Sequence, residues 1–158
     1  MPWDETSPTG NTFSSVDAVP LLEDCTRGLS HNLEKYFRAD SAFCNEDVQR
    51  ACLRLGYRFT ITAHENMGWM ADKEQITNWT PWVWSEEDVK KAHKRGQEFP
   101  KCELGHYLYQ PSWSESIRFT IVVIRTQSSD LSLLSQEWDH YAVMTNFNMF
   151  KTTSQIRM

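Results

Sequence analysis

The sequence has few of the cysteines that would indicate a secreted protein stabilised by disulfides. Only four of its 158 residues are cysteine, and no two of them form the closely spaced C-x-x-C pair of many metal and redox sites. The chain also begins without the charged and then apolar leader of an exported protein. We therefore expect reduced thiols in a cytoplasmic protein. The cysteines are Cys25, Cys44, Cys52 and Cys102.

Long apolar runs and an excess of positive charge are missing as well. The longest apolar run, around residues 119–124, is far shorter than the roughly 20 residues needed to cross a bilayer, which excludes a membrane-spanning helix. The formal net charge is -5, and an acidic protein does not coat nucleic acid through bulk electrostatics. Any contact with DNA must therefore come from a local group of basic side chains.

The sequence does contain enough apolar material for one modest core. Hydrophobic residues make up 40% of the chain, which predicts one domain or part of one. Changes of pattern divide it into an extended lead-in at 1–16, a first part of the core at 17–65, an insertion at 66–116, and further core strands with the start of a closing helix at 117–158. Apolar residues at helical spacing predict a short helix after Asp17, which is placed to cap it.

The clearest pattern is a strand, a helix and a strand in direct succession. The first strand covers residues 35–40 and ends at the polar Asp40. Asn45 can cap the next helix, which ends before Gly56, and alternating apolar residues at 57–63 predict the second strand. Strands joined through a helix pair in parallel, so we expect an α/β to α+β fold with a mixed sheet.

The rest of the chain predicts an insertion and two further strands. Residues 117–125 are β-branched and aromatic, as in a strand buried on both faces, and residues 140–147 form a second such run. The segment 66–116 differs, because it holds five of the seven tryptophans among prolines and a basic run. We interpret it as an insertion on the core, with most of its tryptophans packed inside.

Asp40 is the candidate catalytic residue. A carboxylate at the carboxyl end of a strand, just before the turn into a helix, lies where open sheets with parallel strands expose their sites. Aspartate is also common as a turn or helix cap, and spacing alone favours that structural role. The residues around Asp40 shift the balance toward a function.

Two segments resemble the bacterial DDE insertion-sequence transposases. FRADSAFCNEDVQRACLRLGYRFTITA, residues 37–63, is similar to the part of that family in which a strand ends in an aspartate followed by Ser-Ala or Ser-Gly, and a helix and a strand follow. HYAVMTNF, residues 140–147, resembles the family strand that ends in Thr-Asn. The segments occur in family order with an insertion between them, so the likeness extends over most of residues 17–158.

The resemblance implies part of an RNase H-like core from a DNA transposition enzyme. In that family two aspartates and a glutamate hold two divalent ions, Mg²⁺ or Mn²⁺, which drive cleavage and joining of transposon DNA. Asp40 matches the second aspartate and would be a metal ligand. The first aspartate would lie upstream of residue 1 and the glutamate beyond Met158, so we expect this chain to be inactive alone and to bind the metal weakly. The implied partners are transposon-end DNA and a second copy in a homodimer.

A basic run supplies candidate DNA contacts. KKAHKR, residues 90–95, can track DNA phosphates, although basic residues are equally typical of a solvated helix end. The DNA-binding candidates in this run are Lys90, Lys91, Lys94 and Arg95.

Two other interpretations of the chain stay open. It can be a non-catalytic module that binds DNA or competes for transposase partners. It can also be a complete small α+β enzyme in which a second acid lies near Asp40. The acids considered for that role are Glu65, Glu103 and Asp139.

Overall fold

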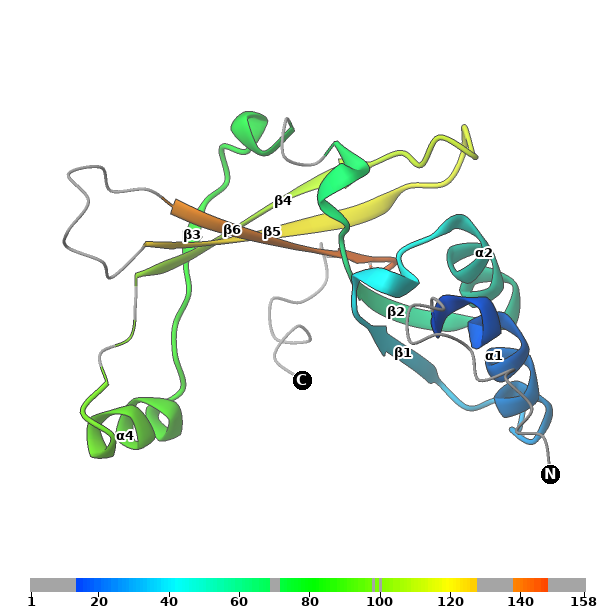
Figure 1. Cartoon of the computed structure of the whole chain (residues 1–158), viewed down its shortest axis with the longest axis horizontal. Coiled ribbons are helices and arrows are strands. Elements are labelled where there is room, and N and C mark those ends of the chain that lie inside the picture. The colour runs from blue at the N-terminus through cyan, green and yellow to red at the C-terminus, as the bar shows by residue number, and fades with distance from the viewer. Residues whose placement is uncertain (1–13, 69–71, 98, 100, 128–137, 148–158) are drawn as a thin grey trace, which may run out of the picture.

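The computed structural model describes residues 14–68, 72–97, 99, 101–127 and 138–147. They form a mixed six-stranded sheet with α-helices (Figure 1), in agreement with the predicted α+β class. The elements in chain order are η1 (Ser14–Asp17), α1 (Ala18–Arg27), β1 (Lys35–Ala39), η2 (Ser41–Phe43), α2 (Glu46–Leu55), β2 (Tyr57–Thr62), η3 (Glu65–Met67), η4 (Lys73–Gln75), β3 (Thr80–Pro81), α4 (Glu86–Lys94), β4 (Cys102–Tyr109), β5 (Phe119–Gln127) and β6 (Trp138–Thr145).

The predicted strand, helix and strand are confirmed as β1, α2 and β2. Asn45 caps α2 by accepting a hydrogen bond from the backbone N–H of Val48 at 3.0 Å. Gly56 ends the helix with a φ of 73°, a left-handed conformation in which a side chain would be strained. Strands β1 and β2 are parallel neighbours, with Lys35 opposite Tyr57. Local signals in the sequence therefore specify this unit.

The sheet has the strand order β1-β2-β6-β5-β4-β3. Strand β6 pairs antiparallel with β2, so the second half of the chain joins the parallel unit along one edge. Strands β4, β5 and β6 form long antiparallel pairs. The segment 66–116, predicted as an insertion, contributes β3 and β4 to this same sheet. The strands predicted at 117–125 and 140–147 are each offset by two residues from β5 and β6.

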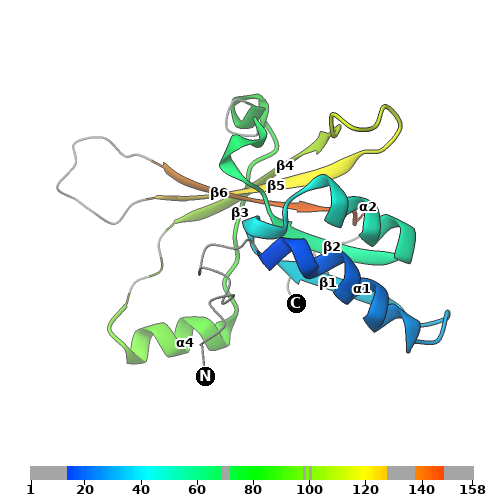
Figure 2. The same ribbon diagram turned by 45° about the vertical axis from the view of Figure 1, so that its right-hand side comes forward.

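The core lies between the sheet and helices α1 and α2, which cover β1 and β2 on one face (Figure 2). Phe59, Ile61, Phe119, Ile121 and Met144 are fully buried there, and their strands alternate so that every second side chain points to the helices. The core therefore spans both halves of the chain. On the opposite face of β1 the side chains are exposed, as the strand's alternating burial shows.

Two expectations for the N-terminal region need correction. Residues 14–16 of the expected extended lead-in belong to the 3-10 helix η1, while residues 1–13 lie outside the described part, as do residues 148–158 with the expected closing helix. Asp17 makes no side-chain cap hydrogen bond, because η1 runs directly into α1 and places Asp17 within a continuous helical turn.

The four cysteines are free. None of the described helices is long and apolar enough to cross a bilayer.

Candidate functional site

Asp40 lies directly beyond the carboxyl end of β1. Its side chain is exposed, and its Oδ1 accepts a hydrogen bond from the backbone N–H of Ala42 at 3.0 Å, which caps the short helix η2. The turn-cap role and the exposed position at a strand end, both foreseen from the sequence, therefore occur together. One carboxylate oxygen is held by the backbone, and the group as a whole faces solvent.

A cavity opens beside Asp40 where β2 ends and β6 continues past it. Its volume is about 360 Å³, and Ser41, the residue after Asp40, contributes to its wall. We call it the β2–β6 notch. It arises because β6 pairs with β2 only at its far end, while its first residues pair with β5 alone. The lining residues are Ser41, Thr62, Ala63, His64, Glu65, His140, Tyr141 and Ala142.

His140 in the notch has a pKa below the usual value of an imidazole. Burial lowers the pKa of His140 from its usual 6.5, and the positive charge of Lys73 lowers it further. The Lys73 Nζ lies 3.5 Å from the His140 Nδ1. The lining of the notch therefore combines the imidazole of His140, the hydroxyl groups of Ser41, Thr62 and Tyr141, and the carboxylate of Glu65.

The Thr-Asn pair at the end of β6 ties that strand to β2. The Thr145 Oγ1 donates to the backbone carbonyl of Phe59 at 2.6 Å. The Asn146 side chain accepts from the Phe59 N–H at 2.8 Å and donates to the Tyr57 carbonyl at 2.9 Å. Asn146 thus satisfies two backbone groups of β2 beyond the last paired residue of β6, which fixes the position of the notch.

The acids considered as partners of Asp40 are placed differently from one another. Glu103 forms an ion pair with Arg125 and lies near Lys101. Asp139 is exposed on β6 opposite Thr126, and Glu65 lines the notch together with Ser41. Within the residues that the structure describes, no three His, Cys, Asp or Glu side chains form a group that could hold a metal ion. Glu65 is therefore the acid that shares a cavity wall with the neighbour of Asp40.

The basic run is at the carboxyl end of α4, which lies away from α1 and α2 (Figure 1). Lys90 and Lys91 form exposed ion pairs with the first turn of the same helix, at 4.0 Å from Glu86 and 2.8 Å from Glu87. Lys94 and Arg95 make no ion pair with any described residue. The helix is therefore acidic at its start and basic at its end, and the uncompensated charge is at that end.

Five tryptophans that the structure describes are engaged in internal contacts, as the sequence predicted for most of them. The ring of Trp84 stacks on Phe99 with centroids 4.3 Å apart and meets Trp82 edge-on. The Trp113 Nε1 donates to the buried Gln49 at 3.0 Å. The guanidinium of Arg125 lies 4.0 Å from the ring of Trp79 and 4.6 Å from that of Trp138. The contacts of Trp79, Trp113 and Trp138 are made at the sheet, and those of Trp82 and Trp84 join the two segments that flank α4.

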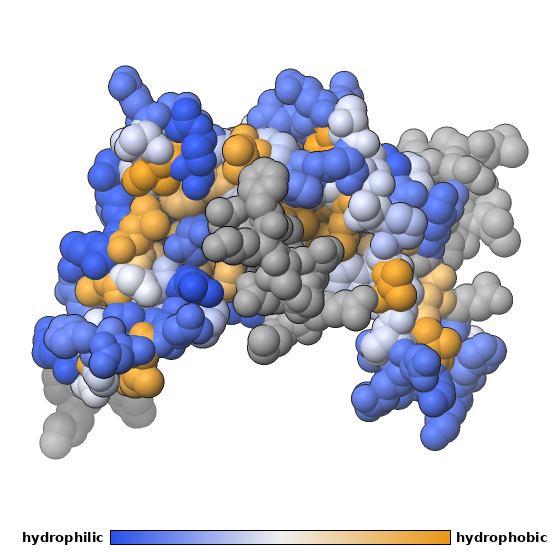
Figure 3. Space-filling view, turned by 180° about the vertical axis from the view of Figure 1, so that it is seen from behind, coloured by the Kyte–Doolittle hydropathy of each residue, from blue (hydrophilic) through white to orange (hydrophobic). Residues whose placement is uncertain are grey.

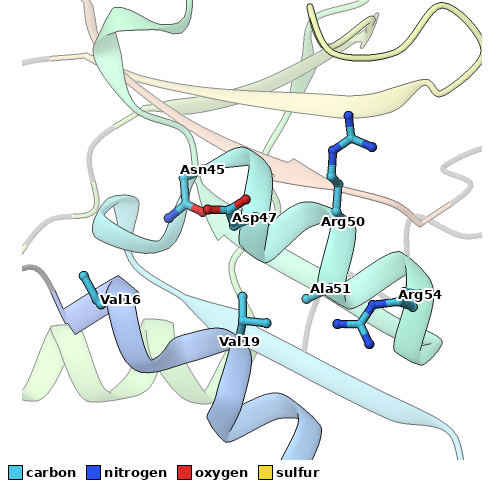
Figure 4. Close-up of a pocket in the computed structure, with 7 residues that line it drawn as sticks. All are labelled: Val16, Val19, Asn45, Asp47, Arg50, Ala51 and Arg54. Carbon is cyan, nitrogen blue, oxygen red and sulfur yellow. The ribbon is translucent and has the colours of Figure 1, made fainter.

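A second cavity, which the sequence did not suggest, lies between η1, α1 and α2 (Figure 4). Its volume is about 540 Å³. Its two arginines are already paired, Arg50 with Glu46 at 2.7 Å and Arg54 with Glu23 at 2.6 Å. The lining holds no nucleophile beside a base, so we treat it as a structural groove. It is lined by Val16, Val19, Asn45, Asp47, Arg50, Ala51 and Arg54.

Comparisons with known protein families, with curated proteins and with solved structures gave no match for this chain. The functional argument therefore depends on the geometry around Asp40 and on the sequence motifs. Sequence reasoning did not single out Arg38, which lies on β1 two residues before Asp40, or Thr62 and Tyr141, which line the notch. The alternation in residues 36–40 already places Arg38 on the same strand face as Asp40, which is the signal that could have identified it.

Proposed function

We propose that this chain is part of a DDE transposase, whose complete form cleaves and joins DNA strands with the help of divalent metal ions. The observation that carries the proposal is the position of Asp40. It lies beyond the carboxyl end of β1 in a parallel β1–α2–β2 unit, exposed and next to the β2–β6 notch. This is where sheets with parallel strands present catalytic groups. The Thr-Asn pair supports the shared arrangement of strands, because it joins the end of β6 to Tyr57 and Phe59, nearer the amino end of β2 than Asp40 is.

The proposal includes a partial RNase H-like core and Asp40 as a ligand of Mg²⁺ or Mn²⁺. An exposed carboxylate with one oxygen engaged fits a metal ligand of this hard, oxygen-preferring kind. Among the described residues no three His, Cys, Asp or Glu side chains gather at Asp40, whereas two ions require a set of carboxylates. We therefore expect weak metal binding and no strand cleavage by this chain alone.

The test follows Mn²⁺ and DNA separately. In amide NMR spectra, paramagnetic Mn²⁺ should broaden the signals of residues 40–42 in the natural chain and not in Asp40→Asn. Asp24→Asn, which changes a carboxylate paired with Arg27 on α1, should keep the broadening. Broadening confined to other acids would contradict the proposal.

A plasmid assay with Mg²⁺ or Mn²⁺ tests the expected inactivity. Nicking that disappears in Asp40→Ala would show a complete metal site and contradict that expectation.

A second candidate function is a non-catalytic module that binds DNA. It is favoured by one observation, the positive charge at the carboxyl end of α4, where Lys94 and Arg95 form no ion pair with a described residue. Binding of DNA without metal, combined with unchanged spectra on addition of Mn²⁺, would favour this candidate over the first.

A further inference from the structure

Arg38 lies on the same strand face as Asp40. Along β1 the side chains of Tyr36 and Arg38 are exposed, while those of Phe37 and Ala39 are half-buried toward the helices. Residues two apart in an extended strand point to the same side, about 6.6 Å from each other. Arg38 therefore projects from the sheet face opposite α1 and α2, on the side from which Asp40 follows. Seen from behind, the molecule shows hydrophilic surface interleaved with apolar surface (Figure 3).

The guanidinium of Arg38 also has no protein partner among the described residues, in contrast to most other arginines. Arg58, on the same sheet face, is 3.5 Å from Glu34, and Arg118 donates to backbone carbonyls. Of the described arginines, Arg38 and Arg95 are the two whose side chains make no ion pair, hydrogen bond or aromatic contact. The residue opposite Arg38 on β2 is the uncharged Thr60. No described residue therefore uses the donors of the Arg38 guanidinium.

A pair of hydroxyl groups follows on the same face. The Thr62 Oγ1 and the Tyr141 hydroxyl are 2.7 Å apart, and both residues line the β2–β6 notch. Thr62 is two residues beyond Thr60 on β2, so it faces the same side as Arg38. Tyr141 is 49% exposed, and its hydroxyl therefore remains within reach of a ligand. Asp139 lies two residues before Tyr141 on β6 and faces the same side. Its negative charge would repel a phosphate, so the binding surface ends there.

From these contacts we propose that Arg38, Thr62 and Tyr141 form a row that binds the phosphodiester backbone of DNA beside Asp40. The inference rests on the proposed function and names the groups that would position its substrate. Arginine presents a planar fork of donors that matches phosphate oxygens, and hydroxyl groups donate single hydrogen bonds to the same oxygens. A positive charge on an edge strand also discourages edge-to-edge pairing, but lysine would serve that purpose equally well. Arg38, Thr62 and Tyr141 would therefore hold a DNA strand in position at Asp40 without taking part in the chemical step.

The experiment measures binding of the full chain to a short fluorescein-labelled duplex and to its single strand by anisotropy over a series of salt concentrations. Removing one phosphate contact should weaken binding and lower the slope of log K against log salt by about one. We expect this for Arg38→Ala, with a loss of affinity of about fivefold at low salt. Arg38→Lys should retain the slope but lose part of the affinity, because it keeps the charge without the fork. Thr62→Val with Tyr141→Phe should weaken binding with no change in slope.

The matched control is Arg27→Ala, which removes the same charge from α1, where Arg27 pairs with Asp24 at 3.0 Å. It should bind DNA like the natural chain. Equal losses in Arg27→Ala and Arg38→Ala would overturn the row, because net charge alone would then explain both. A loss confined to α4 variants, or no DNA binding by the natural chain at low salt, would overturn it too. If Mn²⁺ does not broaden the signals at Asp40 but Arg38→Ala still weakens DNA binding, the metal proposal is wrong. The proposal that Arg38, Thr62 and Tyr141 bind DNA is then still supported.

Discussion

At the residue scale, Asn146 does with its side chain what a further residue of β6 would do with its backbone. Its amide accepts from one β2 backbone N–H and donates to a β2 carbonyl, so two polar groups at the sheet interior stay satisfied. Thr145 adds a buried hydrogen bond to Phe59. The motif that resembles the transposase family thus has a clear structural task in this chain, since it fixes where β6 meets β2.

Gly105 on β4 gives the sharpest prediction for stability. A Cβ at this position would collide with the Ile76 Cγ2 and come within 3.0 Å of the Trp79 ring. Gly105→Ala should therefore lower the free energy of unfolding by about 1–3 kcal/mol, the usual cost of overpacking. Gly28→Ala is the control, because a Cβ there meets nothing within 4 Å. Urea unfolding measures both, and equal stabilities would show that Ile76 and Trp79 move aside freely.

The pKa of His140 gives a prediction for pH dependence. Burial and the charge of Lys73 lower this pKa below 6.5, so the folded state binds the proton less readily than the unfolded chain. The free energy of unfolding should therefore fall as the pH drops below about 6.5 toward the folded pKa. Lys73→Gln should raise the pKa of His140 and reduce this fall. An NMR titration of the imidazole measures it, with Lys91→Gln on α4 as the control that leaves the pKa unchanged.

At the element scale, α4 separates its charges along its length. Ser85 caps the helix, accepting from the Asp88 N–H at 3.2 Å, and acidic residues fill its first turn while basic residues fill the last. Both placements are favourable to the helix dipole. The stability of the helix alone therefore explains why basic residues stand at its end. DNA binding by these residues needs its own experiment.

The charge separation along α4 predicts unequal effects of neutralising its two basic pairs. Lys94→Gln with Arg95→Gln should weaken DNA binding more than Lys90→Gln with Lys91→Gln. Lys90 and Lys91 lie one turn from Glu86 and Glu87, whose negative charge repels phosphates, while the end of the helix is further from them. The salt dependence of binding should fall by about two phosphate contacts in the first variant. Identical losses in the two variants would mean that only the number of charges matters.

At the scale of the whole molecule, Trp113 joins the two halves of the chain. It follows β4 in sequence, yet its Nε1 donates to Gln49 on α2, which is 4% exposed, and its ring lies 4.4 Å from the guanidinium of Arg50. The ring also packs near Phe119. Together with the shared core of β2, β5 and β6, this contact leads us to expect that the sheet and helices α1 and α2 unfold as one cooperative unit.

Removing the hydrogen bond of Trp113 should destabilise both halves together. Trp113→Phe would leave a buried Gln49 oxygen without its donor, which costs about 1–3 kcal/mol. Far-UV circular dichroism in urea should show one transition at a lower midpoint. Trp84→Phe is the control, because it keeps the stack on Phe99 and should change the midpoint less. Two separated transitions in the Trp113 variant would contradict a single cooperative unit.

Prediction from sequence succeeded where the signals are local. The cap at Asn45, the glycine at 56 and the alternation in β2 predicted the β1–α2–β2 unit, including its parallel pairing. Asp17 was wrong as a cap, because η1 extends the helical turn across it. The notch could not be foreseen, because its walls come from residues 41, 62–65 and 140–142, which meet only through strand pairing. Asp40 as a metal ligand and the basic residues of α4 as DNA contacts stay predictions.

The sequence by itself determined the short-range structure, since caps, turns and side-chain alternation depend on residues a few positions apart. It placed Asp40 at the end of a strand, and the alternation of that strand, although not used in the sequence analysis, also puts Arg38 on the same side. Only the tertiary structure decided that β6 lies antiparallel against β2, that the β2–β6 notch opens next to Asp40, and that the Arg38 guanidinium is left without a protein partner among the described residues. These features depend on hydrogen bonds and packing between residues more than eighty positions apart, and no local pattern in the sequence encodes them.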